Sequence, residues 1–451
     1  MKVVNIKENL FVANVNNTFV FIESLPFSVF YVDELQEIAQ EYWNNQNSDL
    51  AEEIYSCLKT QEIISCYGKD FCTIDENYLT FLYIWSTRCN LGCPHCLAGK
   101  GDYGLNHSDM SMETFTKALN TQERHLRKCA ESGKYDSIEI GGYFFGGEPL
   151  MNAENLIRAL GDYEKLRYRL KEDYPNIEFT FSSSISTNGT LLTPEMVKIF
   201  KEHNVEIILS IDGPDHDVAR PYKSGKASLP DVLKALDMLL ENGNHIRINT
   251  VVLPNQMPMI AKRVKWFENI LKGAKNVRVT YSFERGAVGQ ENGPLGCKYN
   301  PDCIEAYKKE VGQYIGDGFD TYETELLRKI SVGGTSHKCS AGLERMCIVP
   351  SGEIYPCQSF IDPKFLMGNI NDTDNGFFNS EIAEMFKARH IDSLEPCKSC
   401  YLKSICNVSF DCASHSRYDL GDFYAVDQET CKAGYEVQSA ILEKIITSQF
   451  E

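Results

Sequence analysis

Residues 78–96 read YLTFLYIWSTRCNLGCPHC, an apolar run that is followed at once by three cysteines. The run predicts a buried strand, because it is short, rich in aromatic residues and bounded by polar ones. Cys89, Cys93 and Cys96 have the spacing C-x3-C-x2-C. Three thiolates on one tight loop can hold three irons of a [4Fe–4S] cluster and leave the fourth iron open. Zinc is the alternative, but a structural zinc site needs a fourth protein ligand.

Further apolar runs follow along the chain, with helical patterns between them. They span residues 137–145, 177–186, 205–212, 245–253 and 276–283. Repeated strand–helix–strand order predicts parallel strands with right-handed crossovers. The six units together predict an α/β fold, a partial (β/α)6 TIM-like barrel, because a full barrel has eight units. A doubly wound open sheet is the alternative.

Two other segments flank this predicted core. Residues 1–76 predict two or three short strands and then helices at 33–45 and 49–64, the order of a winged-helix-like module. Such a small separate module can bind DNA, or a peptide by strand addition, and its acidic helices favour a peptide. The last third of the chain has weak periodicity and eight cysteines, so its core is expected to form around metal. The predicted domains are 1–76, 77–290, a linker over 291–330, and 331–451.

The composition excludes several classes of protein. Lys plus Arg is 45 against 63 for Asp plus Glu, and the net charge of −18 opposes binding to duplex nucleic acid. Asparagines interrupt every apolar run near the start, so no signal peptide is expected. No stretch approaches the roughly 18 apolar residues that a membrane span needs. We therefore expect a cytoplasmic protein, in which clustered cysteines among the 17 are metal ligands or catalytic thiols.

The cysteine loop and the ends of the next predicted strands together resemble the radical SAM superfamily. The second strand ends in Gly146-Gly147-Glu148-Pro149, the third in Ser186-Thr187-Asn188-Gly189, and the fourth in Ser210-Ile211-Asp212-Gly213-Pro214. Each segment alone could be an ordinary turn. All of them fall at the strand ends that form the active-site edge of such barrels. The resemblance covers residues 78–435.

The resemblance implies that S-adenosylmethionine (SAM) chelates the open iron and is cleaved reductively to a 5′-deoxyadenosyl radical. Gly146, Gly147 and Glu148 would accept hydrogen bonds from the methionyl ammonium, which offers donors only. Ser210 and Arg220 would hold the SAM carboxylate, and His95 stands where the family usually has an aromatic residue beside the adenine. The remaining implied SAM contacts are Ser186, Asn188, Asp212, Val251 and Leu253. A flavodoxin or ferredoxin would supply the electron, and no catalytic base can be named.

The C-terminal cysteines resemble the SPASM domain, which carries two auxiliary [4Fe–4S] clusters and would bring the total to three. The resemblance implies Cys339, Cys357 and Cys412 for the first auxiliary cluster. Cys347 would be its fourth ligand, or that position would stay open for a substrate thiolate. The second auxiliary cluster would be held by Cys397, Cys400, Cys406 and Cys431. Five residues separate Cys406 from Cys412, where the family usually has three. A zinc ribbon is the alternative for Cys397 and Cys400 alone.

Other cysteines carry weaker signals. Cys57, Cys66, Cys72 and Cys129 are expected to be small buried hydrophobes. Cys297 and Cys303 lie after the sixth predicted strand, where they could reach a cluster or react with substrate.

The order of module, core and SPASM domain resembles maturases of ribosomally synthesised, post-translationally modified peptides (RiPPs). The first 76 residues resemble the PqqD-like RiPP recognition element, which binds the leader of a precursor peptide. We expect thioether crosslinks between cysteine sulfur and carbon, as in sactipeptide and ranthipeptide synthases. The alternatives are a carbon–carbon crosslinking maturase, an anaerobic sulfatase-maturing (formylglycine-forming) enzyme, and an Fe–S DNA-binding regulator. Sulfatase-maturing enzymes carry an Asp base where this chain has Gln358, and an amide cannot act as that base.

Overall fold

The computed structural model describes most of the chain as two compact units. The described residues are 2–7, 9–64, 78–99, 101–252, 259–283, 322–337, 339–372, 380–406 and 412–450. The core unit comprises Asp75–Cys297 and Ser340–Lys387, and the terminal unit comprises Met1–Ile74, Lys298–Cys339 and Ala388–Glu451. The cysteine-rich stretch after residue 331 therefore contributes to both units.

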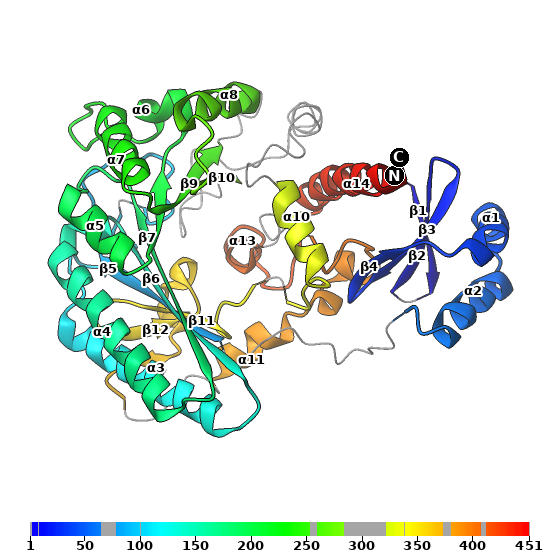
Figure 1. Ribbon diagram of the computed structural model, residues 1–451, viewed down its shortest axis with the longest axis horizontal. Coiled ribbons are helices and arrows are strands. Elements are labelled where there is room, and N and C mark those ends of the chain that lie inside the picture. The colour runs from blue at the N-terminus through cyan, green and yellow to red at the C-terminus, as the bar shows by residue number, and fades with distance from the viewer. Residues whose placement is uncertain are drawn as a thin grey trace. The chain divides into compact units, whose positions relative to one another are not determined.

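A sheet of parallel strands forms the centre of the core unit (Figure 1). Its strands are β5 (Tyr78–Ser86), β6 (Ser137–Gly146), β7 (Glu178–Thr187), β8 (Glu206–Ser210), β9 (His245–Val252) and β10 (Val277–Phe283). All six predicted strands are confirmed, and they lie side by side in sequential order. That order is the order of a barrel wall, whereas a doubly wound sheet reverses its order at a switch point. Closure into a partial barrel stays a prediction.

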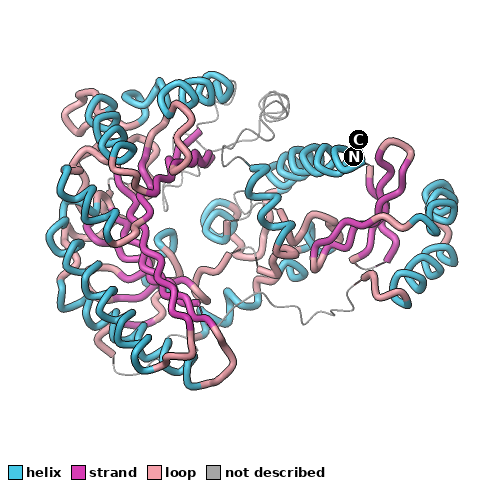
Figure 2. Tube along the Cα trace, viewed as in Figure 1, coloured by secondary structure: helices cyan, strands magenta, loops and turns pink. Residues whose placement is uncertain are grey.

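Helices connect successive strands and cover one face of this sheet (Figure 2). Tyr83 of β5 lies 5.4 Å from Phe115, and Phe144 of β6 lies 6.4 Å from Tyr163, measured between ring centroids. Because side chains alternate along a strand, Tyr143 points to the opposite face, where it packs against a cluster that includes Leu82 and Cys347. The helices are α3 (Met112–Glu131), α4 (Ala153–Asp173), α5 (Pro194–Glu202), α6 (His216–Ala219), α7 (Leu229–Glu241) and α8 (Ile260–Leu271).

The sheet continues beyond β5 with strands that the sequence did not predict. They are β11 (Arg345–Ile348), β12 (Glu353–Tyr355) and β13 (Gly368–Asn369). β11 runs parallel to β5, with Cys347 opposite Leu82, and β12 and β13 follow in antiparallel order. The sheet therefore has three strands in addition to the six that were predicted. A four-residue strand in a turn-rich segment leaves no periodic signal in the sequence. Its pairing places Cys347 in the sheet that carries the cysteine loop.

The terminal unit begins with a four-stranded antiparallel meander followed by two helices. Its elements are β1 (Val3–Lys7), β2 (Leu10–Val15), β3 (Thr18–Ser24), β4 (Phe27–Phe30), α1 (Gln36–Asn45) and α2 (Ser48–Thr60). The two predicted helices are confirmed. The stretch 3–22, which predicts two or three strands, contains β1, β2 and most of β3, and β4 lies beyond it. The turn at Leu25 and Pro26 divides the last apolar run into β3 and β4. A winged-helix identity stays a prediction.

The other helices of the described chain are α10 (Tyr322–Ser331), α11 (Glu381–Ala388), α12 (Glu395–Lys398), α13 (Ala413–Asp419) and α14 (Gln428–Phe450). The N-terminal module stays a prediction, and its strands contact C-terminal residues of the same unit. Phe11 of β2 lies 6.1 Å from Tyr401 between ring centroids, and the Ser404 hydroxyl donates to the Ser24 carbonyl at 2.5 Å. Among the described helices, none combines the length and apolar character needed to cross a bilayer.

Candidate metal centre and active site

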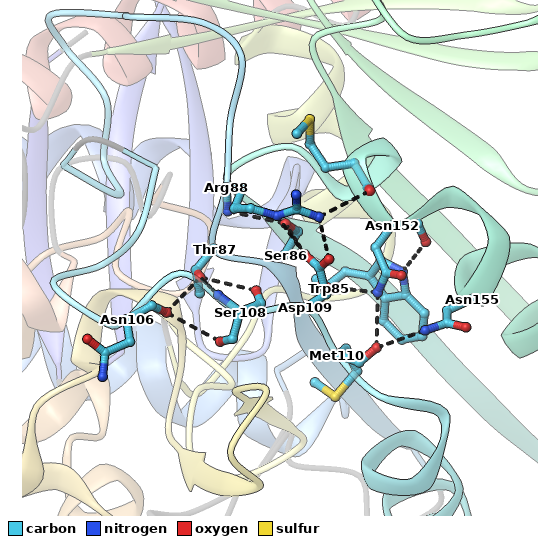
Figure 3. Close-up of polar contacts among 11 residues, drawn as sticks. Trp85, Ser86, Thr87, Arg88, Asn106, Ser108, Asp109, Met110, Asn152 and Asn155 are labelled. Atoms are coloured by element: carbon cyan, nitrogen blue, oxygen red, sulfur yellow. Dashed lines mark hydrogen bonds and ion pairs between the residues drawn. The ribbon is translucent and has the colours of Figure 1, made fainter.

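The cysteine loop leaves β5 and returns to the same point (Figure 3). The Thr87 amide donates to the Ser108 carbonyl at 2.9 Å, and the Met110 amide donates to the Trp85 carbonyl at 2.9 Å. The Ser108 amide in turn donates to the Thr87 hydroxyl at 2.7 Å. Hydrogen bonds therefore join the two ends of the segment that carries all three cysteines.

An ion pair strengthens this closure (Figure 3). Asp109 accepts a hydrogen bond from Ser86 Oγ at 2.7 Å and one from Arg88 Nε at 3.2 Å, and Arg88 Nη2 also contacts it. Arg88 directly precedes the first cysteine, so the pair orients the start of the loop. Sequence reasoning missed both Arg88 and Asp109, because nothing in their spacing marks them as partners.

Two glycines let the next strand approach this loop. The amide of Gly147 donates to the Ser86 carbonyl and the amide of Glu148 to the Arg88 carbonyl, each at 2.8 Å. A Cβ atom on Gly146 would lie 2.3 Å from the Ser86 carbonyl oxygen, and one on Gly147 would lie 2.4 Å from that of Arg88. Only glycine fits at both positions, which explains the Gly-Gly of this segment.

The three thiols fit a set of cluster ligands. Burial raises the pKa of Cys89 to about 11 and that of Cys93 to about 12, and burial also raises the pKa of Cys96. The Leu91 amide points at Cys89 Sγ from 3.5 Å, a donor that suits a thiolate. A bound cation would supply the positive charge that buried thiolates lack. The chemistry of this donor set fits an iron–sulfur cluster.

Asn188 connects the cysteine loop to the end of β7. Its amide nitrogen donates to Asn90 Oδ1 at 2.9 Å and lies 3.9 Å from Cys89 Sγ. Asn90 donates in turn to Thr190 Oγ1 at 2.8 Å. Asn188 was predicted as a SAM contact, and the structure places it beside the cysteine loop; the SAM contact itself stays a prediction. Asn90 was missed, although it lies within the cysteine motif itself.

Glu148 is fully buried and joins the end of β6 to the end of β7. Its carboxylate accepts hydrogen bonds from Leu150 N at 3.0 Å, Thr187 Oγ1 at 2.7 Å and Asn188 N at 2.8 Å. Burial raises the pKa of Glu148 to about 7, and these donors only partly offset that effect. A cationic group placed against this carboxylate would favour its ionised form.

Asp212 and Arg220 form a buried ion pair after β8. Arg220 Nε donates to Asp212 Oδ2 at 2.7 Å and Nη2 donates to Oδ1 at 3.2 Å. Oδ1 also accepts from the Val251 amide at 2.8 Å, which ties in the end of β9. Burial alone would raise the pKa of Asp212, but the Arg220 guanidinium brings it below its usual value. The pair fixes the predicted carboxylate-binding Arg in one orientation.

His95 lies beside this ion pair. Its side chain is 4% exposed, and Nε2 lies 3.8 Å from Asp212 Oδ2. Neither ring nitrogen makes a hydrogen bond within the described part of the chain. Burial, helped by the charge of Arg220, lowers the pKa of His95 to about 4, so the ring is neutral. Buried nitrogens without partners fit a site that a polar ligand completes.

The structure thus brings most predicted SAM contacts to one edge of the sheet. Ser186 and Ser210 lie at the ends of β7 and β8, and Ser186 hydrogen-bonds Tyr143. Leu253 lies outside the described residues, as do Cys66, Cys72, Cys297 and Cys303. The other cysteines lie within the described residues. Cys129 is buried as expected, and Cys57 is half-buried.

The C-terminal cysteines are divided between the two units. Cys347 and Cys357 belong to the core unit, and the other six, Cys339, Cys397, Cys400, Cys406, Cys412 and Cys431, belong to the terminal unit. Burial and the neighbouring Cys357 raise the pKa of Cys347 well above its usual value. The Ser359 amide points at Cys357 Sγ from 3.4 Å, and Gln438 Nε2 points at Cys406 Sγ from 3.5 Å. Such N–H donors fit thiolate ligands.

Comparison with known proteins identifies two domains in this chain. Residues 83–266 match the radical SAM superfamily, and residues 339–401 match the iron-sulfur cluster-binding SPASM domain. Radical SAM cyclopropyl synthase TigE of Paramaledivibacter caminithermalis is 27% identical over 361 residues, which cover 77% of this chain and 70% of TigE. Serine-type and cysteine-type anaerobic sulfatase-maturating enzymes are further relatives.

Two solved structures share the fold. Native anSMEcpe with bound AdoMet aligns with a TM-score of 0.65 at 20% identity, over 82% of this chain and 99% of its own. Streptococcus suis SuiB bound to its precursor peptide SuiA aligns with a TM-score of 0.53 at 17% identity, over 96% and 100%. The chain therefore carries a radical SAM domain and a SPASM domain, and it is an enzyme of the radical SAM superfamily.

Proposed function

We propose that this enzyme cleaves SAM to a 5′-deoxyadenosyl radical and installs thioether crosslinks in a ribosomally synthesised precursor peptide. One observation carries the SAM chemistry: the cysteine loop, Glu148, Asn188 and the Asp212–Arg220 pair meet at one edge of the sheet. The peptide substrate is supported by SuiB, which was solved with a precursor peptide, and by the wider kinship with TigE. The proposed location is the cytoplasm.

Different residues of the core unit would hold the first cluster and SAM. Cys89, Cys93 and Cys96 would hold the first cluster, and the Gly146 carbonyl and Glu148 would accept from the SAM ammonium. When bound, cluster and SAM would supply the 5′-deoxyadenosyl radical, and the auxiliary clusters would accept the electron released as sulfur bonds to carbon. A flavodoxin or ferredoxin would return electrons to the enzyme.

Arg220 is oriented to hold the SAM carboxylate. Asp212 occupies its Nε and Nη2 groups, and within the described residues Nη1 makes no hydrogen bond. A second carboxylate could therefore bind at Nη1 without displacing Asp212. Ser210 lies at the end of the same strand, and His95 offers a flat neutral ring for the adenine.

We propose Cys347 as the fourth ligand of the first auxiliary cluster, beside Cys339, Cys357 and Cys412. Cys347 lies opposite Tyr355, and Cys357 follows two residues later on the same strand direction. Diagonal neighbours of this kind lie roughly 7–8 Å apart on one face of a sheet, a separation that one cluster can bridge. The second auxiliary cluster would use Cys397, Cys400, Cys406 and Cys431.

The N-terminal meander would bind the leader of the precursor. β1 and β4 are the edge strands of its sheet, and an edge strand can pair with an added peptide strand. Deletion of residues 1–76 would not test this cleanly, because it would also uncover residues such as Tyr401 and Ser404. Substitution on a sheet edge is the better perturbation.

Three alternative functions differ in how well the observations support them. A carbon–carbon crosslinking maturase is favoured by TigE, whose name records a cyclopropyl synthase. A sulfatase-maturing enzyme is disfavoured by Gln358, because a neutral amide cannot take a proton in that reaction. A DNA-binding regulator is disfavoured by α1 and α2, which are acidic where duplex binding needs positive charge.

The deciding experiment is coexpression with short peptides encoded beside the gene, followed by anaerobic purification and mass spectrometry. A thioether removes two hydrogens and blocks one cysteine from alkylation by iodoacetamide. A carbon–carbon link removes the same mass but leaves every cysteine alkylated. Product with unblocked cysteines would overturn the thioether assignment, and absence of 5′-deoxyadenosine would overturn the SAM chemistry.

A further inference from the structure

The five residues between Cys400 and Cys406 form an unusual turn in the terminal unit. Connecting segments normally run over the surface, where water satisfies their polar groups. Here Tyr401, Leu402, Lys403, Ser404 and Ile405 are all buried. This segment, the seat, is covered by the N-terminal meander, as its contacts show.

Lys403 makes the main polar contact between the seat and the meander. Its side chain is 3% exposed, and Nζ donates to Asn9 Oδ1 at 2.7 Å and to Asp392 Oδ1 at 2.7 Å. A buried ammonium is costly unless it is paired and hydrogen-bonded. Asn9 directly precedes β2, so Lys403 holds the start of that strand.

Ser404 holds the end of β3 in the same way. Its hydroxyl donates to the Ser24 carbonyl at 2.5 Å, and its own carbonyl accepts from the Thr335 amide at 2.9 Å. Gly334 has a φ of +84°, and a Cβ atom there would lie 2.5 Å from Ser404 Oγ. The Phe27 amide donates to the Gly333 carbonyl at 2.5 Å. The segment 333–335, which contacts Ser404, therefore also holds the start of β4.

Tyr401 links the meander to the helix that carries Cys431. Its ring lies 6.1 Å from Phe11 of β2 and 5.6 Å from Tyr435 of α14, measured between centroids. Its hydroxyl donates to Ser439 Oγ at 2.7 Å. The seat therefore contacts both the meander and the helix of a predicted cluster ligand.

The cysteines at the two ends of the seat fit cluster ligands. Gln438 Nε2 donates to Cys406 Sγ at 3.5 Å, and Lys329 Nζ donates to the Cys406 carbonyl at 2.8 Å. The Cys400 amide is held by the Cys397 carbonyl at 3.0 Å. Ligation at Cys400 and Cys406 would close the seat at both ends and restrict its conformations.

We propose that the seat couples the second auxiliary cluster to the N-terminal meander, with Lys403 as the positioning residue. Cluster binding orders the seat, and the ordered seat holds the ends of β2 and β3. By thermodynamic linkage, the docked meander must then raise the affinity for the cluster by the corresponding factor. The coupling rests on the second auxiliary cluster of the proposed function, but it does not depend on what the meander binds.

The coupling can be measured without a precursor peptide. Hydrogen–deuterium exchange of Leu10–Val15 and Thr18–Ser24 is followed in the anaerobically reconstituted full chain and in the variants Lys403→Met and Asn9→Ala. Loss of the coupling should speed exchange about tenfold in both variants. In equilibrium competition with a chelator, the affinity for about one third of the iron should fall by a similar factor. The same segments should exchange faster when the wild-type protein is stripped of iron.

Two controls separate coupling from general damage. Lys364→Met removes the same charge from an exposed side chain and should change neither measurement. Lys403→Arg keeps the charge and should restore part of the protection. Asn9→Ala leaves the Lys403–Asp392 pair intact, so it keeps the test valid if Lys403→Met fails to fold. Exchange of β2 and β3 that does not respond to iron or to Asn9→Ala would overturn the proposal and leave the peptide-maturase assignment standing.

Discussion

Glu148→Gln should weaken SAM binding and destabilise the core unit. The carboxylate is surrounded by donors, with Leu150 N and Thr187 Oγ1 on one oxygen and Asn188 N on the other. The Thr187 hydroxyl itself accepts from Gly189 N at 3.0 Å, so its proton must point to Glu148. An amide offers only one acceptor atom, and its NH2 group would face one of these donors.

The size of both effects follows from these contacts. A buried donor left without an acceptor costs about 1–3 kcal/mol, and the variant creates two of them, the Asn188 amide and the NH2 group that faces it. We expect the free energy of unfolding to fall by about 2–6 kcal/mol. Removing the ionised partner of the SAM ammonium should cost a further 1.5–3 kcal/mol of binding, which is about 10- to 100-fold in affinity.

The pH dependence gives a second signature of Glu148. Burial raises its pKa to about 7, and a bound ammonium favours the ionised form. The SAM affinity of the wild type should therefore fall as the pH drops below about 7, by up to tenfold per pH unit. Burial lowers the pKa of His95 and of His216 to about 4, so neither titrates in this range. The Gln variant should lose this dependence.

Equilibrium dialysis of SAM against anaerobically reconstituted enzyme, repeated across the pH range, measures both predictions. Thr187→Val is the matched control, because it removes one donor and keeps the carboxylate. It should cost about 1 kcal/mol of stability and preserve the pH profile of SAM binding. A Glu148→Gln variant that binds SAM as tightly as the wild type, with the same pH profile, would refute the reasoning.

The remaining predictions concern iron. Replacing Cys89, Cys93 and Cys96 together by Ala should remove about four of about twelve iron atoms and abolish SAM cleavage; zinc in place of iron would contradict the cluster assignment. Cys347→Ala should lose about four iron atoms as well, whereas full iron content with crosslinking activity would show an open site for a substrate thiol. Asp109→Asn should leave the iron content intact but speed chelation of the first cluster about tenfold, because the loop loses its charged closure; an unchanged rate would mean that the loop needs no such support.

The local pattern of the sequence determined the six parallel strands β5 to β10 of the core unit and about where each one ends. Apolar runs and the turns after them are properties of neighbouring residues, so β5 and β6 could be placed without knowing their partners. Parallel strands bring their carboxyl ends to one edge. That rule predicted that the segments after β6, β7 and β8 would gather beside the cysteine loop, and the resemblance to the radical SAM superfamily singled out Glu148, Asn188 and Asp212 within them.

Contacts between residues far apart in the chain were decided only by the tertiary structure. Lys403 and Asn9 are 394 positions apart, and no periodicity in either segment points to the other. The same holds for β11, whose four residues become a strand only because β5 offers an edge for hydrogen bonds. Arg88 and Asp109 carry ordinary surface charges in the sequence, and only the return of the loop to β5 makes them partners. Local pattern specifies elements, whereas burial and pairing across the chain specify which side chains meet.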